Sequence, residues 1–448
     1  MDKSLSIDDA VTYVLDKAKN LHIEADIIAG GSQNFSLKSE NNQLSEYKVT
    51  SSHSIGIRVI KDEKVATSYS ESLVPKMLDE MLSQASESAE YSKIDSYQKL
   101  NNQTSHIVTP KEEIYQNDHT TTDEKINLAL FLEDEMLSKE YCKSAPYNGY
   151  SNSTSNMIYA NTYGAWCTHL EKSFSCYTSA LLEHNSKQSM FVGVSTGRNF
   201  KELDPSFCID HAYGMAKDLL EGTSIQTGHY SVIFDNSSLN QLFGAFGMCF
   251  SGESAMKGVN PWKEKVETTV ASNLLSISDI SYIKGGNAIK SFDDEGFAST
   301  DTKLIENGIL NTFLHNSKTS KFFNVKNTFN AARSSKGGLS VGEQHMLIET
   351  GKTTKQDICS GKYLEIVELQ GVHSGADSVS GDFSFGASGF LCQDGKRLTP
   401  VRGITVAGNF YKMLQSIEAI GNELEFNYEK DFYAPKIRFD QLQIAGAE

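Results

Sequence analysis

Apolar residues recur at helical spacing in several separate stretches of the chain. The first stretch follows Ser6, a residue type that favours the N-cap position, and it predicts a helix from Ser6 to Asn20. The same period predicts further helices over residues 73–91, 122–141, 204–221, 239–250 and 410–420. The polar segment from Asn101 to Asp118, which contains Pro110, is expected to be a connector.

Short alternating runs of apolar and polar residues lie between the first two predicted helices. They are HIEADIIAG, NFSLKSE, SEYKVTSS, SIGIRVIKD and KVATSYS, and clusters of Gly, Asn or Ser separate them. This pattern predicts a meander of short antiparallel strands. Strand-like alternation returns over residues 155–194.

The second half of the chain begins with the strand-like run GHYSVIFD and is rich in glycine. Its LIENG and QDG segments are typical of hairpin turns, because Asn or Asp followed by Gly supplies the positive φ angles that such turns need. Frequent short strands with many glycines predict a curved or barrel-like sheet. We therefore expect an α+β protein with a mixed N-terminal domain over residues 1–222 and a β-rich C-terminal domain over residues 228–448.

Charge and cysteine content narrow the possible partners and the compartment. The chain has 41 Lys and Arg against 57 Asp and Glu, a net charge of −16, which disfavours nucleic-acid binding. Its seven cysteines are scattered without a CxxC pair. Asp8 and Asp9 stand where a signal peptide would need an apolar run, and no apolar stretch is long enough to span a membrane. A cytoplasmic protein with a protein, peptide or small-molecule partner is expected.

Short motifs add little by themselves. Gly193–Gly197 and Gly338–Gly342 both match G-x-S-x-G, but neither is followed by a predicted helix, so we interpret both as turns. The segment Glu349–Lys355 lacks the upstream glycine of a phosphate-binding loop. The acidic triplet Asp293–Glu295 could bind a cation, but taken alone it is better interpreted as a solvated turn. Five histidines are isolated in sequence and are expected to be ordinary surface or core residues: His211, His229, His315, His345 and His373.

Two longer segments resemble a known family. They are DDEGFASTDTKLIENGILNTFLHN (Asp293–Asn316) and the segment Leu369–Leu414, which contains GDFSFGASGF and ITVAGN. Together with the tail IGNELEF (Ile420–Phe426), they closely resemble the TldD/PmbA family, whose members were once called modulators of DNA gyrase. The strong resemblance covers mainly the last third of the chain.

The resemblance implies a metalloprotease system built from two related chains, TldD and TldE (PmbA). The TldD chain carries HExxxH on a helix and a later Cys ligand. The equivalent segment here is Leu242–Ser254, in which Gly244 and Ala245 replace the first His and the Glu, and Cys249 replaces the second His. The chain has no cysteine after Cys392. Peptide hydrolysis at a zinc ion needs both metal ligands and a base. The resemblance therefore implies a PmbA/TldE-like chain that binds no zinc itself, and zinc is expected on a TldD-like partner.

The implied role is to pair with a TldD-like chain, or with itself as a homodimer, and to help present an unfolded peptide. An extended peptide can add to a sheet edge through main-chain hydrogen bonds. Small and polar residues in GDFSFGASGF would let a peptide backbone approach, and they are the groove candidates: Gly381, Asp382, Ser384, Gly386 and Ser388. The alternative is that these glycines only permit barrel curvature, and the sequence leaves both interpretations open.

Two other functions stay open on the sequence. The chain could be a peptidase in its own right, with a metal site that the sequence does not reveal. It could also modulate another protein, such as DNA gyrase, without proteolysis.

Overall fold

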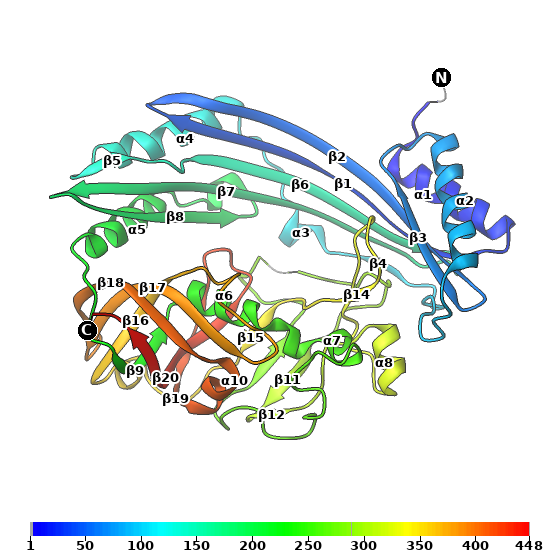
Figure 1. Cartoon of the computed structure of the whole chain (residues 1–448). Helices are drawn as coiled ribbons and strands as arrows, with labels where there is room; N and C mark the ends of the chain where they lie inside the picture. The colour runs from blue at the N-terminus through cyan, green and yellow to red at the C-terminus, as the bar shows by residue number, and fades with distance from the viewer. Residues whose placement is uncertain (1–2, 288, 448) are drawn as a thin grey trace.

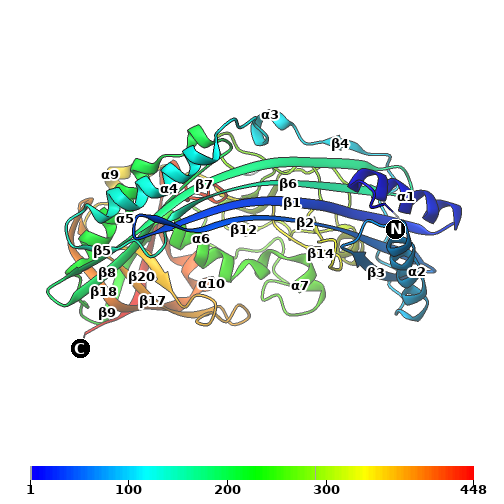
Figure 2. The same ribbon diagram turned by 90° about the horizontal axis from the view of Figure 1, so that it is seen from above.

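The computed structural model describes residues 3–287 and 289–447, which form two large β-sheets and a two-stranded sheet with helices around them. A long, curved first sheet arches over a second domain, and the two lie one above the other (Figure 1). The view from above shows the strands of the first sheet running along most of the length of the molecule (Figure 2).

The first sheet has the strand order β3-β2-β1-β6-β7-β4, and β5 and β8 also pair with β7. Its strands are β1 (Glu24–Glu40), β2 (Gln43–Lys61), β3 (Lys64–Ser70), β4 (His106–Val108), β5 (Cys142–Ser144), β6 (Gly149–Asn161), β7 (Trp166–His184) and β8 (Lys187–Gly197). All pairs are antiparallel except β4 with β7. The meander is therefore confirmed for β1, β2 and β3.

The prediction of short strands is wrong for β1 and β2, each of which joins two of the predicted runs. β1 continues through Gly30 and Gly31, and β2 continues through the Ser51–Ser54 region. Gly and Ser clusters favour breaks, but here their main chain pairs with antiparallel neighbours: β2 and β6 for Gly30 and Gly31, and β1 for Ser51–Ser54. Pairing across the sheet thus overrides the weak local preference of these residues.

Helices cover one face of the first sheet. These are α1 (Ile7–Asn20), α2 (Pro75–Tyr91), α4 (Thr122–Leu137) and α5 (Pro205–Leu220), with the short α3 (Lys111–Ile114) in the connector. The Ser6 side chain accepts a hydrogen bond from the Asp9 N–H, which confirms the predicted cap of α1. α1 and α2 pack on Ala25, Ile27 and Ala29, which alternate along β1 with the residues of the opposite face.

Five strands of the second domain close into a ring, since β20, β18, β17, β16 and β9 each pair with the next and β9 pairs back with β20. The ring strands are β9 (Gly228–Phe234), β16 (Lys362–Gln370), β17 (Asp382–Gln393), β18 (Lys396–Asn409) and β20 (Tyr433–Ala445). The second domain also contains strands outside the ring. They are β10 (Ile277–Asp279), β11 (Thr302–Glu306), β12 (Ile309–Leu310), β13 (Ala331–Ala332), β14 (Ser340–Val341), β15 (Met346–Ile348) and β19 (Ile417–Phe426). The α+β class and the barrel-like second domain are both confirmed.

The helices of the second domain are shorter than predicted. They are α6 (Asn236–Ala245), a 3-10 helix (Gly247–Phe250), α7 (Gly252–Met256), α8 (Ser317–Phe323), α9 (Lys355–Ile358) and α10 (Phe410–Met413). The helix predicted over 410–420 ends early because Ile417 and Ile420 belong to β19, which pairs with β20. The helix predicted over 239–250 breaks near Phe246, whose side chain is fully buried among other aromatic rings.

Both predicted Gly turns are confirmed. Asn307 and Gly308 have positive φ between β11 and β12, and Asp394 and Gly395 have positive φ between β17 and β18. None of the helices that the structure describes is long and apolar enough to cross a membrane.

His315 sits in the interior of the second domain and gives a test of the fold. It is 2% exposed, its Nδ1 lies 3.1 Å from Thr319 Oγ1, and burial lowers its pKa to about 4. The unfolded chain therefore takes up this proton before the folded chain does, so the stability that the neutral ring provides is present at pH 7 and is lost as the pH falls from about 6.5 toward 4.

We predict that His315→Gln reduces the pH dependence of unfolding in this window. The slope of the free energy of unfolding against pH should fall by up to about 1.4 kcal/mol per pH unit, because one proton fewer is taken up on unfolding. Urea denaturation at a series of pH values measures it. His373→Gln, a change at an exposed histidine, is the control and should leave the slope unchanged. Equal slopes for wild type and His315→Gln would contradict the assignment.

Candidate functional site

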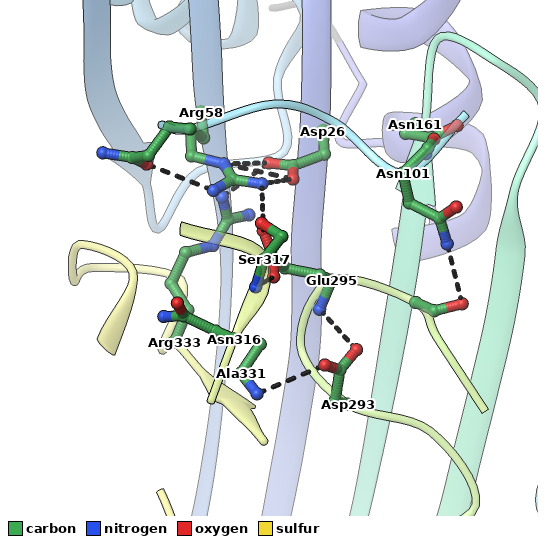
Figure 3. Close-up of polar contacts among 12 residues, drawn as sticks. Asp26, Arg58, Asn101, Asn161, Asp293, Glu295, Asn316, Ser317, Ala331 and Arg333 are labelled. Carbon is green, nitrogen blue, oxygen red and sulfur yellow. Dashed lines mark hydrogen bonds and ion pairs between the residues drawn. The ribbon is translucent and has the colours of Figure 1, made fainter. Parts of the chain in front are cut away.

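A buried group of charged side chains joins the two domains (Figure 3). Asp26 of β1 lies between two guanidinium groups, with Arg58 Nη2 and Arg333 Nη1 each 2.5 Å from one of its carboxylate oxygens. Arg58, on the neighbouring β2, also lies 3.5 Å from Glu295 Oε1. All four side chains are at most 2% exposed. Two residues come from the first sheet and two from the second domain, so their attraction acts across the domain boundary.

Backbone groups hold the second domain's part of this cluster in place. Glu295 accepts hydrogen bonds from the N–H and the hydroxyl of Ser317, at the start of α8. Asp293 accepts from the N–H groups of Glu295, Phe297 and Ala331. The loop is thus folded around its own carboxylates, as Figure 3 shows.

The two carboxylates at the centre have opposite pKa shifts. Burial alone would raise the pKa of Asp26, but the Arg333 and Arg58 charges outweigh it and hold that pKa below its usual value. For Asp293, burial and the nearby negative charge of Glu295 raise the pKa to about 8, although three N–H donors oppose the rise. The two arginines thus favour an ionised Asp26, whereas burial beside Glu295 favours a protonated Asp293.

The interpretation of Asp293–Glu295 as a solvated turn is wrong, because Asp293 and Glu295 are fully buried. Sequence reasoning also missed Asp26, Arg58 and Arg333. The available signal was a charged residue inside a strand that is otherwise apolar, as in EADIIAG and IGIRVI. Such residues are buried only when they are paired, and one of the two partners of Asp26, Arg333, lies 307 positions away.

The hairpin that carries Arg333 approaches the first sheet closely. A Cβ on Gly56 of β2 would lie 1.7 Å from the carbonyl oxygen of Ser335, so only glycine fits there. Beside it, the hydroxyls of Ser54 and Ser335 are 2.6 Å apart. Gly56 therefore lets the two backbones meet next to the ion cluster.

A second set of contacts joins the domains at the end of β8. Thr196 donates its hydroxyl to the carbonyl of Tyr428 at 3.2 Å, and the Asn287 side-chain amide donates to Thr196 Oγ1 at 3.0 Å. Arg198 donates to Glu171 at 3.1 Å and also to the carbonyl of Asn287. These contacts attach the first sheet to the second domain at a place separate from the ion cluster.

Between these two attachments, the sheet face that carries Asp26 is strongly polar. The strand registers place one set of small polar residues on this face: Ser32, Asn34, Ser36, Thr50, Ser52, Ser54, Ser151, Ser153, Ser155, Ser173, Ser175 and Thr196. Several bond across strands, such as Ser32 with Ser52 at 3.1 Å and Ser153 with Ser173 at 2.7 Å. Its small residues offer hydroxyl donors and acceptors, while Ile28, Tyr159 and Cys167 on the same face pack against Phe292 of the second domain.

The three positions of the expected metal helix do not come together as a site. Gly244 and Ala245 end α6, whereas Cys249 lies in the following 3-10 helix and is fully buried in the apolar core. Burial raises the pKa of the Cys249 thiol well above its usual value, which keeps it protonated. Within residues 3–287 and 289–447, no three His, Cys, Asp or Glu side chains are grouped so that they could hold a metal ion.

A pocket of about 460 Å³ lies beside this broken helix. Gly244, Gly247 and Ser251 line it, together with the carboxylates of Glu253 and Glu343. Glu253 is paired with Lys257 at 2.7 Å. The location that would hold the metal ligands is therefore an open polar surface with only two acidic side chains.

The groove candidates lie on and just before β17. Gly381 precedes the strand with a positive φ, Asp382 and Ser384 are exposed, Gly386 is half-buried, and Ser388 is only 5% exposed. β17 is an inner strand of the ring, paired with β16 on one side and β18 on the other. The structure thus leaves no free edge along Gly386–Gln393, so a peptide cannot add to the main chain there, and contact with the exposed side chains stays a prediction.

Three domain profiles of one family match the chain. Their descriptions are PmbA/TldA metallopeptidase domain 1 over residues 25–89, the central domain over 115–220, and the C-terminal domain over 227–446. The fold and these matches together define a member of a metallopeptidase family. The chain belongs to the PmbA/TldD family.

Individual members of the family match this chain along almost its whole length. The chain is 23% identical to the metalloprotease PmbA homolog of Haemophilus influenzae, covering 98% of this chain and 95% of that protein. Its fold is similar to a Thermotoga maritima protein named as a modulator of a DNA gyrase, with a TM-score of 0.87, 24% identity, and coverage of 98% and 100%. It is also similar to TldE from Thermococcus kodakarensis, with a TM-score of 0.83, 22% identity, and coverage of 98% and 100%.

We predict that Asp26→Asn destabilises the chain by about 3–5 kcal/mol, because it leaves two buried guanidinium groups without a full counter-charge. Urea denaturation of the purified protein measures this. Asp16→Asn, a change at an exposed residue of α1, is the matched control and should stay within about 0.5 kcal/mol of wild type. Equal stability of the two variants would show that the cluster does not hold the domains together.

Proposed function

We propose that this chain is the non-catalytic subunit of a cytoplasmic two-chain peptidase. A TldD-like partner would supply the zinc and the base, and this chain would complete a shared chamber and help hold an unfolded peptide. The single observation that carries the proposal is the replacement of the HExxxH residues by Gly244, Ala245 and Cys249 in a chain that keeps the whole family fold.

The geometry of these positions supports the loss of metal chemistry. A hydrolytic zinc site needs three protein ligands around an open position, with a base close to the bound water. Here the one thiol in the segment, that of Cys249, is buried in the core, and Gly244 and Ala245 carry no ligand atom. The break between α6 and the 3-10 helix also places Ala245 and Cys249 in different helical segments.

The polar face of the first sheet supports a role in holding peptide. An unfolded polypeptide exposes a main-chain donor and acceptor at nearly every residue. A wall of hydroxyl and amide side chains can satisfy these groups without selecting one side-chain sequence. Attachment of the sheet at both ends leaves this wall facing the second domain.

We predict that the purified chain binds no stoichiometric zinc and cleaves no unfolded peptide by itself. Elemental analysis and a protease assay with a fluorescent casein-type substrate measure the two properties. One zinc per chain, together with cleavage that a chelator abolishes, would instead support an independent peptidase.

We also predict that the chain associates into a dimer, with itself or with a TldD-like chain from the same organism, since closed two-fold pairing is the commonest form of assembly. Light scattering gives the mass of each mixture. The mixture should cleave an unfolded peptide, whereas a TldD-like chain alone should cleave it more slowly. A persistent monomer, with no effect on the partner's activity, would rule out the proposed role.

A further inference from the structure

A groove of about 370 Å³ separates β8 from the second domain. Among the residues that the structure describes, β8 has a strand neighbour only on its β7 side, so it forms an edge of the first sheet. Figure 1 shows β8 on the side of the first sheet that lies toward the second domain. An edge strand offers unpaired main-chain groups to an extended chain, which β17 does not.

The groove has an apolar part. Val192 and Val194 lie on the same face of β8 as Thr196, the residue that bonds to Tyr428 of the second domain. Opposite them, Val367 and Leu369 of β16 line the groove. Alternate side chains of an extended peptide could pack here.

The charged part of the groove has a single sign. Asp235, Glu368, Glu429 and Asp431 line it, and none of its lining residues in the described part of the chain is Lys, Arg or His. The chain as a whole has 41 Lys and Arg for 57 Asp and Glu. A lining with four carboxylates and no cationic side chain is therefore more acidic than the composition of the chain predicts. Glu368 is half-buried, and its side chain makes no hydrogen bond or ion pair within residues 3–287 and 289–447, although its main chain belongs to β16.

Aromatic rings at the same place also favour a cation. Phe191 and Tyr428 both line the groove, and each ring contacts the imidazole of His211, with centroid distances of 5.5 and 4.9 Å. Tyr428 Oη lies 2.9 Å from His211 Nε2, and burial lowers the pKa of His211, so this ring is neutral near pH 7. Aromatic faces attract ammonium and guanidinium groups, and the attraction grows when the cation leaves bulk water.

We propose that this groove binds an extended, basic segment of polypeptide. Its main chain lies along the edge of β8, its apolar side chains pack on Val192 and Leu369, and a Lys or Arg side chain is held between the carboxylates and the aromatic rings. The inference rests on the proposed function in one respect, that the ligand is a peptide, and it adds a preference for basic sequences.

Direct binding to this chain tests the preference without any protease. Three short unfolded peptides share the same apolar residues and carry Lys, Gln or Glu at the remaining positions. Fluorescence anisotropy gives the dissociation constant of each at low and at high salt. We expect the Lys peptide to bind about tenfold more tightly than the Gln peptide, the Glu peptide to bind most weakly, and salt to reduce the difference.

Variants locate the binding site. Glu368→Gln and the double change Glu368→Gln/Glu429→Gln keep side-chain size and remove charge, so the fold should be retained. They should reduce the affinity for the Lys peptide about fivefold or more while leaving the Gln peptide unchanged. Glu80→Gln is the matched control, since Glu80 is an exposed carboxylate on α2, far from the groove.

The outcomes separate this proposal from the proposed function. Equal affinities for the three peptides, no binding by any of them, or a loss that Glu80→Gln reproduces would each overturn the basic groove. Peptide cleavage by the two-chain mixture is measured separately, so an active mixture with no charge preference would retain the subunit role and reject only the groove. Charge-dependent binding without cleavage would retain the groove and reject the subunit role.

Discussion

The structure depends on the placement of Asp26 between two buried guanidinium groups. A buried carboxylate is very costly unless opposite charges surround it, and one of those charges comes from the other domain through Arg333. The first sheet can therefore occupy its observed position only if the hairpin carrying Arg333 and the loop carrying Glu295 are both folded. Each domain satisfies a buried charge of the other, which couples their folding and fixes their orientation.

This constraint determines where a ligand can bind. The ion cluster holds one part of the first sheet, contacts around Thr196 and Asn287 hold another, and the sheet face between them is lined with serine, threonine and asparagine. Apart from Ser54 and Thr196, the hydroxyl groups of this face take no part in the two attachments described above. The free edge of β8 and the acidic groove beside it lie next to the second attachment.

The broken helix and the groove suggest different roles for the two sides of the proposed chamber. At the helix, Gly244 and Ala245 carry no ligand atom and the Cys249 thiol is buried in the core. At the groove, carboxylates and aromatic rings could still select a ligand by charge. A chain that has lost the reacting groups and kept its binding surfaces would contribute specificity, while its partner contributes the chemistry.

The sequence alone was enough to predict the α+β class, most of the helices, the Asn-Gly and Asp-Gly turns and the family, because each rests on local spacing or on contiguous motifs. It could not predict the long strands β1 and β2, the inner position of β17, or the burial of Asp293 and Glu295. Each of these depends on a partner far away in the chain: a neighbouring strand supplies the hydrogen bonds of Gly30 and Ser52, β16 and β18 enclose β17, and Arg58 compensates Glu295 across the domain boundary. The identity of a charged residue does not show whether it is solvated or buried. Only the tertiary structure brings its counter-charge within a few ångströms.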